Sequence, residues 1–115
     1  MRAWRRAAHS AAATSVTGTA VRIQLTISML MLRNAGIRSL IVAGVTTEVC
    51  VHTTVREAND RGFECFVPSD CVASYFPEFH EVGLRMIAAQ GGIFGWVTAS
   101  QNLLAHLLPT AAVVN

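Results

Sequence analysis

Short apolar runs alternate with polar, glycine-containing breaks along the chain, and this pattern predicts a mixed α/β protein. The runs Ser39–Ala43 and Phe63–Val67 are largely apolar and rich in β-favouring residues, which is typical of parallel strands covered on both faces. Ile93–Val97 predicts a third strand of the same kind.

Apolar residues at helical spacing predict helices between and around these strands. Glycine after the last turn, or proline before the first, marks the helix ends. The expected helices are residues 23–34 before Gly36, Thr46 or Thr47 to Asp60 before Gly62, Glu78–Ala89 after Pro77, and Ser100–Leu108 before Pro109.

This order of elements predicts the topology. Right-handed crossovers make the strands parallel with helices on both faces, which is a three-layer αβα, Rossmann-like fold. Three strands form a thin sheet whose edge would expose apolar residues and unpaired backbone groups. The pattern therefore indicates half of a larger domain, or a protein that forms a homo-oligomer or associates through its exposed sheet edge.

The two ends of the chain differ from the rest. Residues 1–22 are rich in Arg, Ala, Ser and Thr, show no helical or strand periodicity, and are expected to be unstructured or atypical. Organellar transit peptides share this composition, but no cleavage-site pattern supports targeting. We favour a tail, or a reading frame that begins within another coding region. Residues 23–108 then form the domain and 109–115 a tail.

Composition narrows the class of protein. The 115 residues have room for one small domain, and no apolar run approaches the ~20 residues of a membrane helix. A net charge of +2 is too small to indicate a nucleic-acid partner. The three cysteines, Cys50, Cys65 and Cys71, are irregularly spaced and form no metal pattern. We therefore expect a cytoplasmic protein without a disulfide scaffold, metal or cofactor.

Cys50 is the residue whose position points most directly to chemistry. It falls in the first turn of the helix that follows the strand Ser39–Ala43. Unpaired N–H groups at a helix N-terminus stabilise a thiolate, so Cys50 is a candidate nucleophile. A buried, inert cysteine is the alternative, because that is the usual state of a free cysteine. Position alone leaves both interpretations open.

The stretch Leu40–Val51, LIVAGVTTEVCV, closely resembles the nucleophile segment of the isochorismatase-like cysteine hydrolases. This superfamily includes nicotinamidases, N-carbamoylsarcosine amidohydrolases, and ureidoacrylate and biuret hydrolases. Arg56–Gly62, Ser74–His80 and Ala89–Gly92 look most similar to the biuret hydrolase branch. The resemblance covers roughly residues 34–104.

The resemblance implies a Cys–Asp–Lys triad on a six-stranded parallel sheet, and a thioester formed from a small amide or ureide substrate. Cys50 would be the nucleophile. A cis peptide bond would join Val45 to Thr46, and the N–H of Thr46 would serve the oxyanion hole. Gln90 falls where biuret hydrolase-like enzymes place a substrate-contacting glutamine. Tyr75 is a weaker candidate for lining the substrate pocket, and a core or oligomer contact is its alternative.

The sequence also departs from the family pattern, because the chain contains no lysine. Its only aspartates are Asp60 and Asp70, and neither matches the family's acid. Asp60 lies about 15 Å from Cys50 along the predicted helix. We therefore expect a truncated domain that lacks a recognisable triad. Three hypotheses remain: an amide-cleaving hydrolase, an inactive half-domain that acts by association, and a redox-sensing thiol protein.

The histidines and the other cysteines receive ordinary structural roles. His52 is expected to pack or lie on the surface, His80 and His106 to be solvated, Cys65 to lie in the core, and Cys71 to be a buried or loop thiol.

Overall fold

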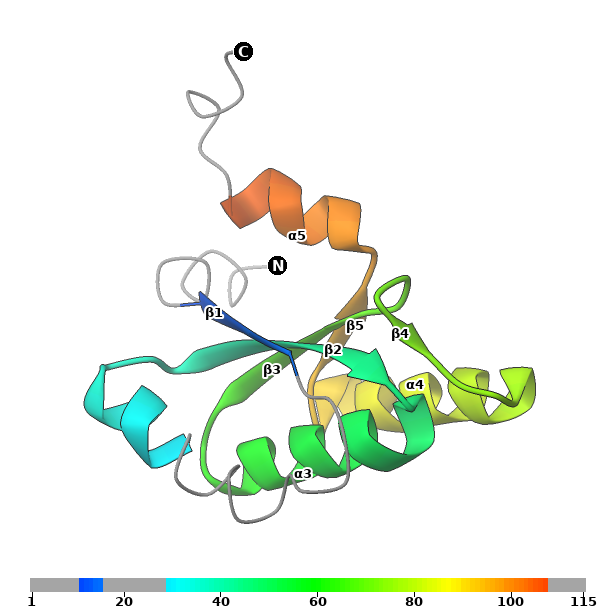
Figure 1. Cartoon of the computed structure of the whole chain (residues 1–115), viewed down its shortest axis with the longest axis horizontal. Coiled ribbons are helices and arrows are strands. Elements are labelled where there is room, and N and C mark those ends of the chain that lie inside the picture. The colour runs from blue at the N-terminus through cyan, green and yellow to red at the C-terminus, as the bar shows by residue number, and fades with distance from the viewer. Residues whose placement is uncertain (1–10, 16–28, 108–115) are drawn as a thin grey trace.

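A parallel β-sheet lies at the centre of the molecule (Figure 1). The computed structural model describes residues 11–15 and 29–107. Strands β1 (Ala11–Ser15), β2 (Ser39–Val45), β3 (Glu64–Pro68) and β5 (Trp96–Thr98) follow one another in the order β1-β2-β3-β5. The short strand β4 (Val72–Ala73) pairs with the end of β2. All of these pairings are parallel, which confirms the predicted sheet.

Helices cover both faces of the sheet, as the three-layer prediction requires (Figure 1). A helical stretch at residues 29–34, α3 (His52–Asp60) and α4 (Pro77–Gly92) lie on one face, and α5 (Ser100–Leu107) lies on the other. A π-helical segment, η1 (Thr47–Val51), joins β2 to α3. No described helix is long and apolar enough to cross a membrane.

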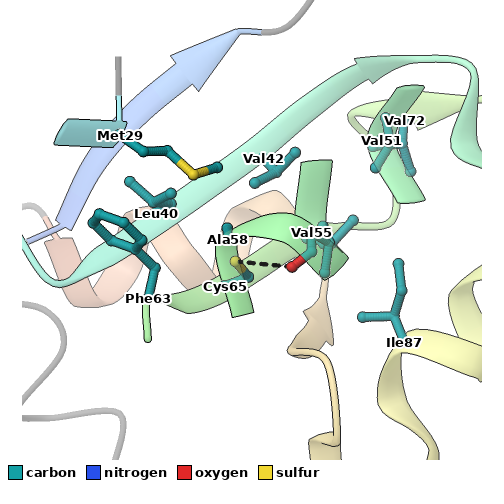
Figure 2. Close-up of a cluster of buried hydrophobic side chains, with 11 residues drawn as sticks. Met29, Leu40, Val42, Val51, Val55, Ala58, Phe63, Cys65, Val72 and Ile87 are labelled. Carbon is teal, nitrogen blue, oxygen red and sulfur yellow. Dashed lines mark hydrogen bonds between the residues drawn. The ribbon is translucent and has the colours of Figure 1, made fainter. Parts of the chain in front are cut away.

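Two clusters of buried side chains hold the layers together. The larger one, shown in Figure 2, packs Val42 of β2 and Cys65 of β3 against Val55 of α3 and Ile87 of α4. The smaller one joins Phe66, on the opposite face, to Leu103 of α5. Because successive residues of a strand point to opposite faces, Cys65 and Phe66 serve the two clusters separately.

The structure contains strands that the pattern did not predict. We expected three strands, but β1 lies within the segment 1–22, and β4 lies between the predicted strand Phe63–Val67 and the predicted helix Glu78–Ala89. The edge of β2 that a three-strand sheet would expose is therefore paired with β1. The rest of segment 1–22, the start of the predicted helix 23–34, and the tail lie outside the described residues.

The predicted helix ends agree closely with the structure. Gly36 and Gly62 adopt φ values of 78° and 84°, which L-residues with side chains rarely adopt. In α4 the backbone leaves helical geometry from Ala89 to Gly91, which confirms the predicted end of this helix.

Candidate active site

Cys50 lies in η1, immediately beyond the carboxyl end of β2. It is half-buried, and its carbonyl oxygen accepts a hydrogen bond from Thr54 Oγ1 at 2.7 Å. The turn before it is closed by the carbonyl oxygen of Thr46, which accepts from the N–H groups of Val49 at 3.2 Å and Val51 at 3.1 Å. The backbone therefore fixes the helical turn that carries the thiol.

The peptide bond between Val45 and Thr46 is cis, as the resemblance implied. Thr46 occupies the cap position of η1 with extended backbone (φ −99°, ψ 145°), but its side chain makes no capping hydrogen bond. Gly44 donates its N–H to the carbonyl oxygen of Cys71 at 2.9 Å and so joins this turn to the segment before β4.

His80 of α4 supports the nucleophile segment from outside. Its Nδ1 is hydrogen-bonded at 2.8 Å to Oγ1 of Thr47, the fully buried first residue of η1. We expected His80 to be solvated, and that expectation is wrong because α4 packs against η1. Local spacing along the sequence could not indicate this contact, because its two residues belong to separate helices and are 33 positions apart.

We expect His80→Ala to destabilise the chain by about 0.5–1.5 kcal/mol, because it leaves the buried Thr47 hydroxyl without its partner. Thermal unfolding followed by circular dichroism measures this loss. His106→Ala is the control, since His106 is exposed on α5 and its Nδ1 is hydrogen-bonded to the Asn102 carbonyl oxygen of the same helix. Equal destabilisation by the two changes would contradict the supporting role.

The other two candidate site residues lie at different ends of α4. Tyr75 follows β4, whose Ala73 pairs with Val45, so it lies at the same edge of the sheet as the Thr46 turn. Its side chain is 87% exposed, which rules out the core interpretation. Gln90 is exposed at the other end of α4 with φ 53°, away from the His80 contact. The substrate contact of Gln90 stays a prediction.

Asp70 has a structural role. Its carboxylate accepts hydrogen bonds from the Ser100 N–H, at 2.8 Å, and from the Ser100 hydroxyl, and so caps α5. These hydrogen bonds lower the pKa of Asp70. Asp60 ends α3, at the far end of the helical segment from Cys50. Neither aspartate is placed as a catalytic base.

The Asp70 cap makes a testable contribution to the pH dependence of stability. Because the folded-state pKa is lowered, the carboxylate stabilises the fold above about pH 4 and loses this effect as pH falls through the folded pKa. We expect the melting temperatures of the wild type and Asp70→Asn to differ at neutral pH and to converge in acid. Asp60→Asn serves as the matched control. A difference that persists unchanged into acid would contradict the assignment.

The remaining thiols differ from Cys50 in their surroundings. Cys65 is 1% exposed in the core, and burial together with the nearby Glu64 raises its pKa to about 12. Cys71 is exposed before β4. The core role of Cys65 and the loop position of Cys71 are confirmed. Among the described residues no three His, Cys, Asp or Glu side chains are grouped so that they could hold a metal ion.

These features define an α/β protein that presents a thiol in a helical turn at the carboxyl end of a central parallel strand. The isochorismatase domain matches residues 28–102, which is more than half of the chain. The chain therefore belongs to the isochorismatase family.

Individual relatives agree with this assignment. Nicotinamidase 3 of Arabidopsis thaliana is 40% identical over 57 residues, which are 50% of this chain and 29% of the relative. The ureidoacrylate amidohydrolase RutB of Methylorubrum extorquens is 38% identical over 69 residues, covering 59% of this chain and 27% of the relative. An isochorismatase-like hydrolase from Alkaliphilus metalliredigens superposes with a TM-score of 0.63 at 30% identity, covering 69% of this chain and 42% of that one. The chain thus spans less than a third of these two curated relatives.

Proposed function

We propose that the chain carries the nucleophile of a cysteine hydrolase that cleaves a C–N bond in a small amide or ureide. The observation that carries this proposal is the position of Cys50, in a π-helical segment that follows β2 directly. Family membership and the names of the relatives, a nicotinamidase and a ureidoacrylate amidohydrolase, support the substrate class.

The proposed reaction has two steps. The Cys50 thiolate attacks the carbonyl carbon, the C–N bond breaks, and the leaving nitrogen departs with a proton as ammonia or an amine. Water then attacks the thioester, which releases the acid and restores the thiol. We assign the N–H groups of Thr46 and Cys50 to the developing oxyanion, and one such donor is worth about 3 kcal/mol of barrier. Tyr75 is proposed to face the substrate from the same edge of the sheet.

The proposed hydrolase needs a side chain that transfers protons at Cys50, whereas the alternative function does not. The chain contains no lysine, and Asp60 and Asp70 have the structural positions described above. Among the described residues, no side chain is hydrogen-bonded to the sulfur of Cys50. The second candidate function is therefore an inactive half-domain that acts by association, and the missing lysine is the observation that favours it. The free thiols are consistent with the proposed cytoplasmic location.

Two measurements on the purified chain distinguish the candidates. The first is acylation by an activated ester, located by mass spectrometry, and the second is ammonia release from nicotinamide and from ureidoacrylate. We expect Cys50 to be acylated at least about tenfold faster than the exposed Cys71. Ammonia release together with acylation supports the hydrolase. Acylation without ammonia release favours the half-domain, and acylation of Cys50 no faster than that of Cys71 contradicts the nucleophile assignment.

A further inference from the structure

A groove lies between α4 and the continuous segment formed by η1 and α3. It has a volume of about 440 Å³. Its α4 wall is an apolar stripe of Phe79, Val82 and Met86, with exposed fractions of 49%, 43% and 46%. These residues recur at helical spacing on a helix whose buried side is formed instead by Gly83 and Ile87. The stripe is therefore a second apolar surface, separate from the core.

The other wall of the groove is polar and is formed by η1 and α3. Glu48 of η1 and His52 and Arg56 of α3 follow one another at intervals of four residues along it. His52 is 7% exposed, and its Nδ1 accepts a hydrogen bond from Arg56 Nε at 3.0 Å, so the ring proton resides on Nε2. Its other ring nitrogen faces the backbone of Gly83, which is a hydrogen-bond partner of His52. Among the described residues, the buried Oε2 of Glu48 has no hydrogen-bond partner. A buried polar atom without a partner is uncommon in folded proteins, so the Glu48 oxygen is open to a donor from solvent or from another chain.

The groove has an acidic end and a basic end. The two walls run in the same direction along the chain. Thr47 contacts His80 near the start of each wall, and Gly83 lies next to His52 further along. At the far end, the Arg56 guanidinium lies 4.1 Å from the ring centroid of Phe94, which follows α4. Glu78 and Glu48 therefore lie toward one end, and Arg56 lies toward the other. Eight residues separate Glu48 from Arg56 and also Glu78 from Met86, a rise of about 12 Å on each wall.

We propose that this groove binds the same groove of a second copy of the chain, with the two α4 helices antiparallel across a twofold axis. A twofold axis places each acidic end on the basic end of the other copy, so a single surface provides both sides of the contact. The stripes of Phe79, Val82 and Met86 pack together at the centre. Arg56 of each copy lies against Glu78 of the other. Its guanidinium N–H groups thereby reach the acidic end of the groove, where Glu48 Oε2 has no hydrogen-bond donor. Charge complementarity within one surface favours a second copy over an unrelated partner.

Sedimentation velocity over a range of concentrations tests the apolar centre of this interface. We expect a monomer–dimer equilibrium for the wild type, and Val82→Glu is expected to weaken it by at least about tenfold. Leu104→Glu is the matched control, because Leu104 is 53% exposed on α5 at the opposite face of the sheet. A wild type that stays monomeric at all concentrations overturns the proposal, and so does a dimer that Val82→Glu leaves intact.

Charge reversal tests the twofold arrangement. We expect Arg56→Glu and Glu78→Arg each to weaken self-association, because each places like charges together at both ends of the interface. An equimolar mixture of the two variants is expected to recover a heterodimer, since every reversed charge then meets an opposite one. Recovery on mixing also excludes misfolding as the cause of the single losses. Failure of the mixture to associate, with both variants folded by circular dichroism, overturns the arrangement.

Discussion

Cys50→Ala is expected to remove at least about nine-tenths of the acylation of the chain by an activated ester. The remaining signal should come from Cys71, the exposed thiol, because Cys65 is buried and its pKa is raised. The physical reason is the position of Cys50, half-buried in η1 beyond the carboxyl end of β2 and close in sequence to the Thr46 N–H assigned to the oxyanion. Peptide mass spectrometry after timed labelling measures the loss.

Cys71→Ala is the matched control, and it is expected to leave most of the acylation in place. Both changes remove one thiol, and neither residue belongs to the buried core. Circular dichroism of each variant verifies that the fold is retained. If Cys71→Ala removes most of the signal instead, Cys50 is an inert cysteine and the hydrolase proposal fails at its first step.

Ile87→Ala is expected to destabilise the chain by about 2–5 kcal/mol. Ile87 is fully buried in the larger core cluster and, with Gly83, forms the buried side of α4 (Figure 2). Truncation removes its apolar contacts and leaves a cavity that the neighbouring side chains fill only partly. A domain of this size is stable by about 5–15 kcal/mol, so the loss is a large fraction of the total. Urea denaturation measures it.

Leu104→Ala provides the comparison for Ile87→Ala, because Leu104 is 53% exposed on α5. We expect its effect to stay within about 0.5 kcal/mol. His80 of α4 supports the segment that carries Cys50, so a less firmly packed α4 in Ile87→Ala should also slow the acylation of Cys50. Similar losses of stability in the two variants would show that α4 is not anchored through Ile87.

Local sequence patterns predicted the strands and helix ends whose physical requirements are met by neighbouring residues in the chain. The strands β2 and β3 were predicted from nearly continuous apolar runs, because a strand covered on both faces needs apolar residues at every position. Gly36 and Gly62 marked helix ends because the chain there adopts positive φ values. The position of Cys50 followed from the order strand, turn, helix, and its assignment as a nucleophile came from the resemblance.

The misses share a different cause. Strand β1 lies in a segment without periodicity, and β4 has only two residues, so both depend on pairing with β2. Such pairing joins residues far apart in the chain, and no local pattern encodes it. His80 was placed in solvent because its partner, Thr47, belongs to another helix. Tyr75 was a weak candidate for the substrate pocket with the core as one alternative, and its exposed side chain excludes the core.

The sequence by itself determined the family, the parallel α/β class and the identity of the candidate nucleophile, because these depend on a continuous segment and on local periodicity. Only the tertiary structure decided which side chains support that segment and which surface remains open. Asp70 became a helix cap because β3 leads its carboxylate to the start of α5. The groove between α3 and α4 exists because two helices far apart in sequence pack side by side over one face of the sheet.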